Sequence, residues 1–98
     1  MVLEHALLSV KRGREQDFEA AFRQAQDIIT GMPGFGGLRL SRCLERPDTY
    51  LLLVEWNRLE DHTVGFRGSA EYQRWRSLLH HFYDPFPTVE HYEQVLSA

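Results

Sequence analysis

The sequence predicts an α+β fold with the element order β-α-β-β-α-α-β, in which helices cover one face of an antiparallel four-stranded sheet. Two observations carry this prediction. Segments of β type are separated by segments whose apolar residues recur every three to four positions. In the stretch 50–57, apolar side chains also occupy both faces of one strand, because successive side chains alternate across the sheet. Both faces of that strand therefore need a cover.

Length and composition set the class of the protein. The chain has 98 residues, of which 43% are hydrophobic and 26% charged, values typical of one ordered domain, here residues 1–98, with a single core. A net charge of −3 argues against a nucleic-acid partner or an anionic membrane surface. Cys43 is the only cysteine, which indicates a reducing compartment. No apolar run reaches the roughly 18 to 20 residues of a membrane helix. We therefore expect a cytoplasmic protein that binds no membrane.

The first half of the chain is predicted to form a strand, a helix and a hairpin. Residues 2–10 form a strand with polar interruptions, and a helix follows from Arg14, with its apolar face at Phe18, Ala21, Phe22, Ala25, Ile28 and Ile29. Gly and Pro in the segment 30–34 end that helix. Strands over 35–44 and 50–57 flank turn-forming residues, so we expect an antiparallel hairpin.

The second half is predicted to contain two helices and a last strand. Asn57 and Glu60 resemble a capping box at the start of a short helix that Gly65 and Gly68 weaken. Ser69 opens the next helix, whose wide apolar face holds Tyr72, Trp75, Leu78, Leu79 and Phe82. Two prolines within 84–87 end it. Residues 88–96 then form a polar-rich strand.

This order is the split β-α-β pattern of ferredoxin-like folds. Two helical faces cover only one side of such a sheet, and the other side retains the second apolar face of the strand 50–57. A second copy of the chain is the simplest cover. The sequence therefore predicts a homodimer whose sheets pack face to face.

The chain resembles the antibiotic biosynthesis monooxygenase (ABM) domain of the dimeric α+β barrel superfamily. The resemblance rests on the passage from strand to helix at 55–62 (EWNRLEDH), on Ser69–Ala70–Glu71–Tyr72, on Pro33–Gly34–Phe35 and on 87–92 (PTVEHY). It implies a homodimeric barrel with a cavity between the sheet and the helices of each protomer. Some members oxidise phenolic compounds to quinones with dioxygen and no prosthetic group; others degrade haem, or isomerise or dismutate small metabolites.

His62 and Tyr72 are the predicted catalytic residues. The position of His62 resembles that of a polar pocket residue in the quinone-forming branch, and a histidine can take a proton from a phenol because its ordinary pKa is about 6.5. The deprotonated ring can then reduce dioxygen directly. Tyr72 can orient a substrate hydroxyl by hydrogen bonding. The structural alternative for His62 is simple packing beside Leu59 and Phe66.

Six further residues are predicted to bind the substrate. Trp56, Phe66, Trp75 and Phe82 offer aromatic surfaces, although aromatic residues at helical spacing also form cores. Phe66 stands where the oxygenase and haem-degrading branches tend to carry Trp. His5 either lines the barrel or is an exposed strand residue. Arg39 and Arg42 lie on opposite faces of one strand, and we take Arg39 as the group for an anionic oxygen, the alternative being a solvated or interface arginine.

Other residue patterns argue against metal and nucleophile chemistry. His80 and His81 diverge by about 100° on a helix, and His91 does not complete a ligand set by spacing. Cys43 has no activating partner at a recognisable spacing. We therefore predict a cofactor-independent monooxygenase that acts on a small phenolic or quinol compound. The alternative is a non-catalytic small-molecule-binding or stress-related dimer with the same fold.

Overall fold

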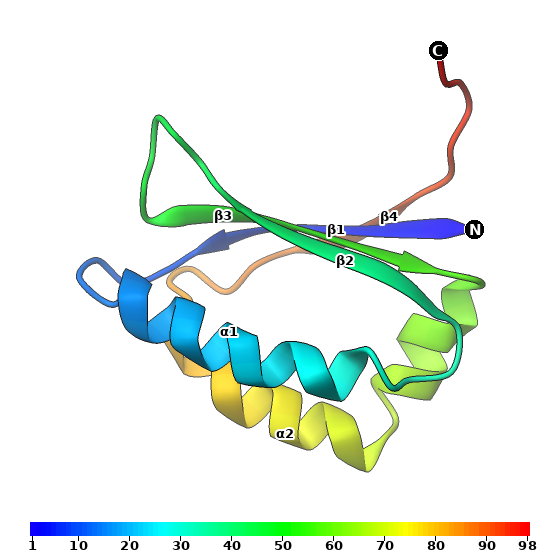
Figure 1. The fold of residues 1–98 in the computed structure, drawn as a ribbon, viewed down its shortest axis with the longest axis horizontal. Coiled ribbons are helices and arrows are strands. Elements are labelled where there is room, and N and C mark those ends of the chain that lie inside the picture. The colour runs from blue at the N-terminus through cyan, green and yellow to red at the C-terminus, as the bar shows by residue number, and fades with distance from the viewer.

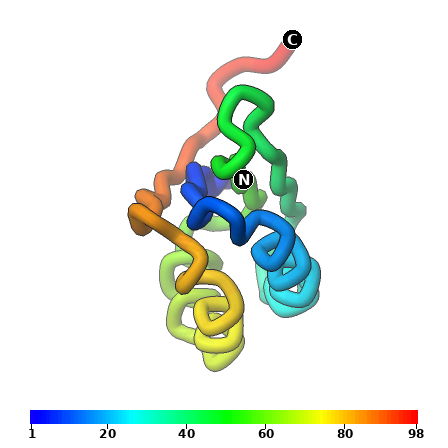
Figure 2. The backbone as a smooth tube through the Cα atoms, turned by 90° about the vertical axis from the view of Figure 1, so that its left-hand side faces the viewer, coloured from blue at the N-terminus to red at the C-terminus, as the bar shows by residue number.

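The computed structural model describes residues 1–98 and shows one antiparallel sheet with the strand order β2-β3-β1-β4. The strands are β1 (Val2–Ser9), β2 (Phe35–Arg42), β3 (Thr49–Trp56) and β4 (Val89–Tyr92). The helices α1 (Glu15–Ile29) and α2 (Ala70–Leu79) lie side by side beneath the same face of the sheet (Figures 1 and 2). The predicted ferredoxin-like α+β fold is confirmed.

The core forms where the helices meet the central strands. β3 pairs with β1 from Thr49↔Ser9 to Trp56↔Val2 and with β2 on its other edge. Tyr50, Leu52, Val54 and Trp56 alternate toward the helices and are buried. From α1, the same core receives Phe18, Phe22, Ala25 and Ile29, which is the apolar face expected from the spacing. The strand with two apolar faces is thus central to the sheet.

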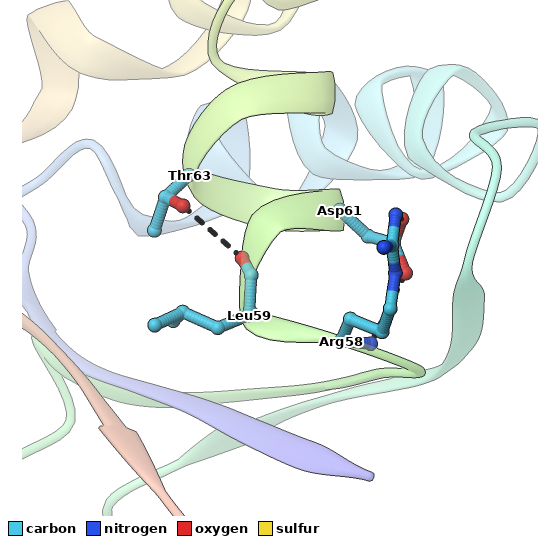
Figure 3. A network of polar contacts seen from close by, with 4 residues as sticks. All are labelled: Arg58, Leu59, Asp61 and Thr63. Atoms are coloured by element: carbon cyan, nitrogen blue, oxygen red, sulfur yellow. Dashed lines mark hydrogen bonds and ion pairs between the residues drawn. The ribbon is translucent and has the colours of Figure 1, made fainter.

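A short helical segment, η1 (Asp61–Phe66), connects β3 to α2, and the predicted capping box of Asn57 and Glu60 is wrong. Its first turn is held instead by Asp61, whose carboxylate accepts the backbone N–H of Arg58 at 3.1 Å. Thr63 donates its hydroxyl to the carbonyl of Leu59 at 3.2 Å (Figure 3). Asn57 is engaged elsewhere, because its backbone N–H donates to the carbonyl of Gly34 at 2.8 Å.

Gly34 fixes where this segment starts. Its φ of +82° lies in the left-handed region, and a Cβ added there would overlap the side chain of Asp61. Glycine adopts this φ without strain and leaves room for the Asp61 side chain. The segment then winds as a π-helix, with the N–H of Arg67 bonded to the carbonyl of His62 at 3.1 Å. The turn before β2 and the segment that carries His62 are therefore packed against each other.

The second helix follows its predicted signals, but the last strand is shorter than expected. Ser69 caps α2, its Oγ accepting the N–H of Tyr72 at 3.1 Å. β4 ends at Tyr92 rather than at residue 96. Tyr92 pairs with Leu3, one residue from the start of β1, so the chain beyond it has no strand left to pair with. β2 likewise ends at Arg42, two residues before the predicted end.

The face of the sheet opposite the helices carries no covering element (Figure 1). The side chains that alternate onto it include four leucines, of which Leu7 is 48% exposed and Leu3, Leu51 and Leu53 are half-buried. The β2–β3 connection and the C-terminal tail extend on this side of the sheet (Figure 1). We call this the open face. No helix in the structure combines the length and the apolar character needed to cross a membrane.

Candidate functional site

A cavity of about 260 Å³ lies between the sheet and the helical layer. Its wall combines polar groups, including Glu4, His62 and Arg67, with aromatic rings. A larger groove of about 440 Å³ runs along α1 and β2. Its one carboxylate, Glu19, already pairs with Arg42, so we place the site in the smaller cavity.

Glu4 is the most unusual group in this cavity, because a carboxylate is 5% exposed beneath a sheet. It lies on β1 in phase with Ala6 and Leu8, which places it on the helix-facing side. Its Oε1 accepts the indole N–H of Trp56 at 2.9 Å and lies 3.4 Å from Nε2 of His62. Burial is the main effect on Glu4 and raises its pKa, against the opposing effects of Trp56 and the positive charge of Arg67.

His62 comes from η1 and is held on both sides of its ring. Its Nε2 faces Glu4, and its Nδ1 is 2.7 Å from Nε2 of His91 on β4. The ring stacks on Trp56 with the centroids 5.4 Å apart and the planes at 12°. Neither ring nitrogen is thus free of a protein partner. Burial, followed by the positive charges of Arg67 and His91, lowers the pKa of His62 to about 3.

The four side chains therefore form a continuous polar row through an apolar core, in the order Trp56, Glu4, His62 and His91. The row begins at the fully buried indole and ends at a half-buried imidazole on the edge strand β4. Burial, and next Arg67, also lower the pKa of His91. Burial favours the neutral forms of Glu4 and His62. Glu4 can therefore hold a proton while both side chains stay uncharged.

Aromatic rings complete the lining of the cavity. Phe66 meets Tyr72 and Trp75 edge to face, with centroids 5.3 and 5.5 Å apart. Tyr83 and His80 also line the cavity, and burial raises the pKa of Tyr83. Flat apolar surfaces and polar groups in one cavity suit a planar ring that carries a hydroxyl. In this structure no group of three or more His, Cys, Asp or Glu side chains is arranged to hold a metal ion.

The chain matches a known protein family over most of its length. The model of the family described as antibiotic biosynthesis monooxygenase matches residues 1–78. This chain belongs to the ABM family. The uncharacterized protein YczJ of Bacillus subtilis (strain 168) is 62% identical over 95 residues, which cover 97% of this chain and all of that protein.

Solved structures agree with the ABM assignment. A candidate antibiotic biosynthesis monooxygenase from Bordetella bronchiseptica is 39% identical, with a TM-score of 0.92 and 97% of each chain covered. A second, from Nitrosomonas europaea, has a TM-score of 0.81 at 18% identity, with 98% of this chain and all of that chain covered. At that identity the second likeness shows the shared fold alone.

The structure brings several of the predicted ABM site residues together. His62, Phe66, Tyr72 and Trp75 all line the cavity. Trp56 is not among the residues that line the cavity. It contacts two of them, because its ring stacks on His62 and its indole N–H donates to Glu4. These residues come from β3, η1 and α2, and the passage from strand to helix at 55–62 supplies two of them.

Three predicted substrate-binding residues lie elsewhere. His5 and Arg39 are on the open face: His5 packs edge to face on Tyr92 at 5.5 Å, and Arg39 pairs in register with Leu53. The alternation of β1 and β2 turns them away from the helices. Phe82 is buried in the core against Phe18, with their centroids 5.6 Å apart. None of these three side chains therefore lines this cavity.

Sequence reasoning missed Glu4, Arg67, Tyr83 and His91 as site residues. Glu4 shares its parity with Ala6 and Leu8, which was a usable signal, but both faces of β1 carry leucines and the pattern did not separate them. His91 is 29 positions from His62 along the chain. No spacing rule joins two such residues: the β1–β4 pairing places His91 opposite Glu4, and η1 brings His62 to both.

Proposed function

We propose that the cavity binds a small phenolic or quinol compound and that the protein oxidises it with dioxygen without a prosthetic group. The observation that carries the proposal is a buried Glu4–His62 pair, with Oε1 and Nε2 3.4 Å apart, in a cavity that aromatic rings also line. Membership of the ABM family supports the reaction class. The volume of about 260 Å³ lies just below the usual range of ligand pockets, about 300–1,000 Å³, so the ligand is small.

The chemistry requires a proton acceptor and a place for negative charge. Removing the phenolic proton makes the ring electron-rich enough to reduce dioxygen. For a phenol with a free ring position, one oxygen atom becomes the second carbonyl of the quinone and the other leaves as water, and the substrate supplies the electrons. Arg67 on the cavity wall stabilises the phenolate by its charge. Tyr72 orients the ring through its hydroxyl, and His62 belongs to the polar row that receives the proton.

Oxygen uptake tests this proposal. A panel of hydroquinones and naphthols is incubated with the protein, and dissolved oxygen is followed with an electrode. We expect uptake with one- or two-ring phenols, with a large loss in His62→Ala and a smaller one in Tyr72→Phe. The matched control is His81→Ala, because His81 is exposed and outside the cavity. Uptake that is the same in His62→Ala and His81→Ala would contradict the assigned role.

A second function, binding without oxidation, is favoured by one feature of the site. Both ring nitrogens of His62 contact protein groups, which suits a stable binding pocket as well as a proton path. Quenching of the Trp56 and Trp75 fluorescence reports ligand binding separately from oxygen uptake. Saturable quenching by phenols that are never oxidised would favour this function and refute the enzyme.

We also propose that a second copy of the chain covers the open face. The support is the set of leucines at Leu3, Leu7, Leu51 and Leu53 and a buried Nδ1 of His5 that has no hydrogen-bond partner within one protomer. Sedimentation at micromolar concentration should show a dimer. Leu53→Glu should dissociate it, whereas Val64→Glu should not, because Val64 is exposed on η1. A monodisperse wild-type monomer would exclude the dimer.

A further inference from the structure

The two carboxyl oxygens of Glu4 have different surroundings: both protein contacts are made by Oε1. Trp56 and His62 both approach Oε1, at 2.9 and 3.4 Å. This leaves Oε2 for the cavity, whose wall includes Glu4. In contrast, both nitrogens of His62 already face protein groups. A ligand hydroxyl in the cavity can therefore reach the carboxyl of Glu4 more directly than it can reach a nitrogen of His62.

The remaining contacts lead away from the cavity. From Nε2 of His62 the path crosses the imidazole to Nδ1, and 2.7 Å further lies Nε2 of His91. His91 is half-buried on β4, the edge strand of the sheet. A row of this kind moves a proton when each member donates to the next and accepts from the one before it. The carboxyl and the two imidazoles each have two sites and meet that condition.

We propose that Glu4 takes the proton of the bound hydroxyl and that His62 and His91 pass a proton on to solvent. The proposal rests on the proposed function and deepens it by naming the acceptor and the path. At rest, Glu4 carries a proton on Oε1, His62 on Nδ1 and His91 on Nδ1. As the ligand proton reaches Oε2, the Oε1 proton moves to Nε2 of His62, and the Nδ1 proton of His62 moves to Nε2 of His91.

Charge and proton count are balanced along this path. The ligand becomes an anion beside Arg67, and His91 becomes an imidazolium that releases its Nδ1 proton to water. Glu4 and His62 remain neutral before and after the transfer. That agrees with the raised pKa of Glu4 and the lowered pKa of His62, both caused mainly by burial. The groups facing Glu4 are Trp56, His62, Arg67 and Tyr83, and none of them is a second carboxylate.

The positions of the protons in the resting protein can be tested without any substrate oxidation. Nitrogen-15 NMR of the imidazoles in the full-length wild-type protein at neutral pH should show His62 neutral with its proton on Nδ1. It should also show a strongly deshielded proton shared with His91, lost in His91→Gln and kept in His81→Gln. A His62 proton on Nε2, or an imidazolium at mildly acidic pH, would overturn the relay whether or not any phenol is oxidised.

Kinetics test the role in catalysis. Glu4→Gln keeps the shape of the carboxyl but cannot pass a proton, and its kcat should fall about 100-fold or more with little change in KM. His91→Gln should lose about tenfold, because water can partly replace it, and added imidazole should restore the activity of His91→Gly.

The comparison with His81→Gln decides the last step of the path. Equal rates in His91→Gln and His81→Gln, or no rescue by imidazole, would overturn the role of His91. If the wild-type protein oxidises no phenol, the proposed function fails, while the NMR experiment still decides whether the three side chains hold their protons as described. The two failures are therefore distinguishable.

Discussion

At each end of β3 an aromatic side chain donates a hydrogen bond to a glutamate, but the pKa values of the two glutamates shift in opposite directions. At one end the indole N–H of Trp56 donates to Glu4 at 2.9 Å, and at the other the hydroxyl of Tyr50 donates to Glu19 at 2.6 Å. Burial raises the pKa of Glu4, whereas hydrogen bonds from Arg42 and Tyr50 lower the pKa of Glu19. A hydrogen-bond donor alone does not fix the charge of a carboxylate.

The two glutamates differ in their access to water and in whether a cation contacts them directly. Glu19 lies on α1 at the open groove, where Arg42 neutralises it and solvent reaches it. Glu4 lies under the sheet, where its contacts are an indole and a neutral imidazole. Removing a carboxylate from water costs more free energy than one hydrogen bond from a neutral donor contributes. Proton chemistry is therefore expected at Glu4, and structural pairing at Glu19.

The largest expected effect comes from removing each donor. Trp56→Phe leaves Glu4 buried with one contact fewer and also leaves a void, so we expect a loss of about 2–4 kcal/mol in the free energy of unfolding. Tyr50→Phe should cost about 1 kcal/mol, because Glu19 keeps Arg42 and water. Urea denaturation at fixed protein concentration measures both.

Trp75→Phe is the matched control for this pair. It removes the same volume from a buried indole, but Trp75 contacts Phe22 and Phe66 rather than Glu4. A loss in Trp56→Phe no greater than in Trp75→Phe would show that the bond to Glu4 contributes nothing. Equal losses in Trp56→Phe and Tyr50→Phe would remove the contrast between the two ends of β3.

The next effect is on the pH dependence of stability. The lowered pKa of His62, about 3 against 6.5, means that the unfolded chain binds more protons in that window, so this residue makes stability rise with pH. The raised pKa of Glu4, above 4.5, gives the opposite slope from 4.5 up to its folded value. Between 4.5 and the raised pKa of Glu4, and below 6.5, the contributions of these two residues to the slope therefore offset each other.

Single variants should expose each slope. In Glu4→Gln only the His62 contribution remains, so stability should fall as the pH is lowered from 6.5. In His62→Gln only the Glu4 contribution remains, and stability should fall as the pH rises from 4.5. Thermal unfolding across this range measures both. Parallel profiles in the two variants would contradict the opposite pKa shifts of Glu4 and His62.

The smallest effect should come from the exposed pair. Arg42→Gln removes the cation beside Glu19, so the pKa of Glu19 should move back toward its ordinary value. The melting temperature should drop slightly at low salt and match the wild type at about 1 M salt, where charges are screened within about 3 Å. The effect of Trp56→Phe should persist at that salt concentration. Equal salt sensitivity of both variants would contradict the difference in burial.

Much of the fold was predictable because it depends on local patterns. The apolar spacing of α1, the Ser69 cap of α2 and the turn before β3 each act within a few residues. The end of β4 was not predictable in this way, since it depends on where β1 begins. The start of η1 likewise depends on the close approach of Gly34 and Asp61.

The sequence by itself determined the α+β order, the two apolar faces of β3, the ABM resemblance and four of the residues that line the cavity. Tertiary structure alone decided that Glu4 faces the helices and His5 does not, and that His91 completes the polar row. The physical reason is sequence distance: Glu4 and Trp56 are 52 positions apart and His62 and His91 are 29 apart. Side-chain alternation gives relative orientation within a strand, and only strand pairing and helix packing set which face becomes the interior.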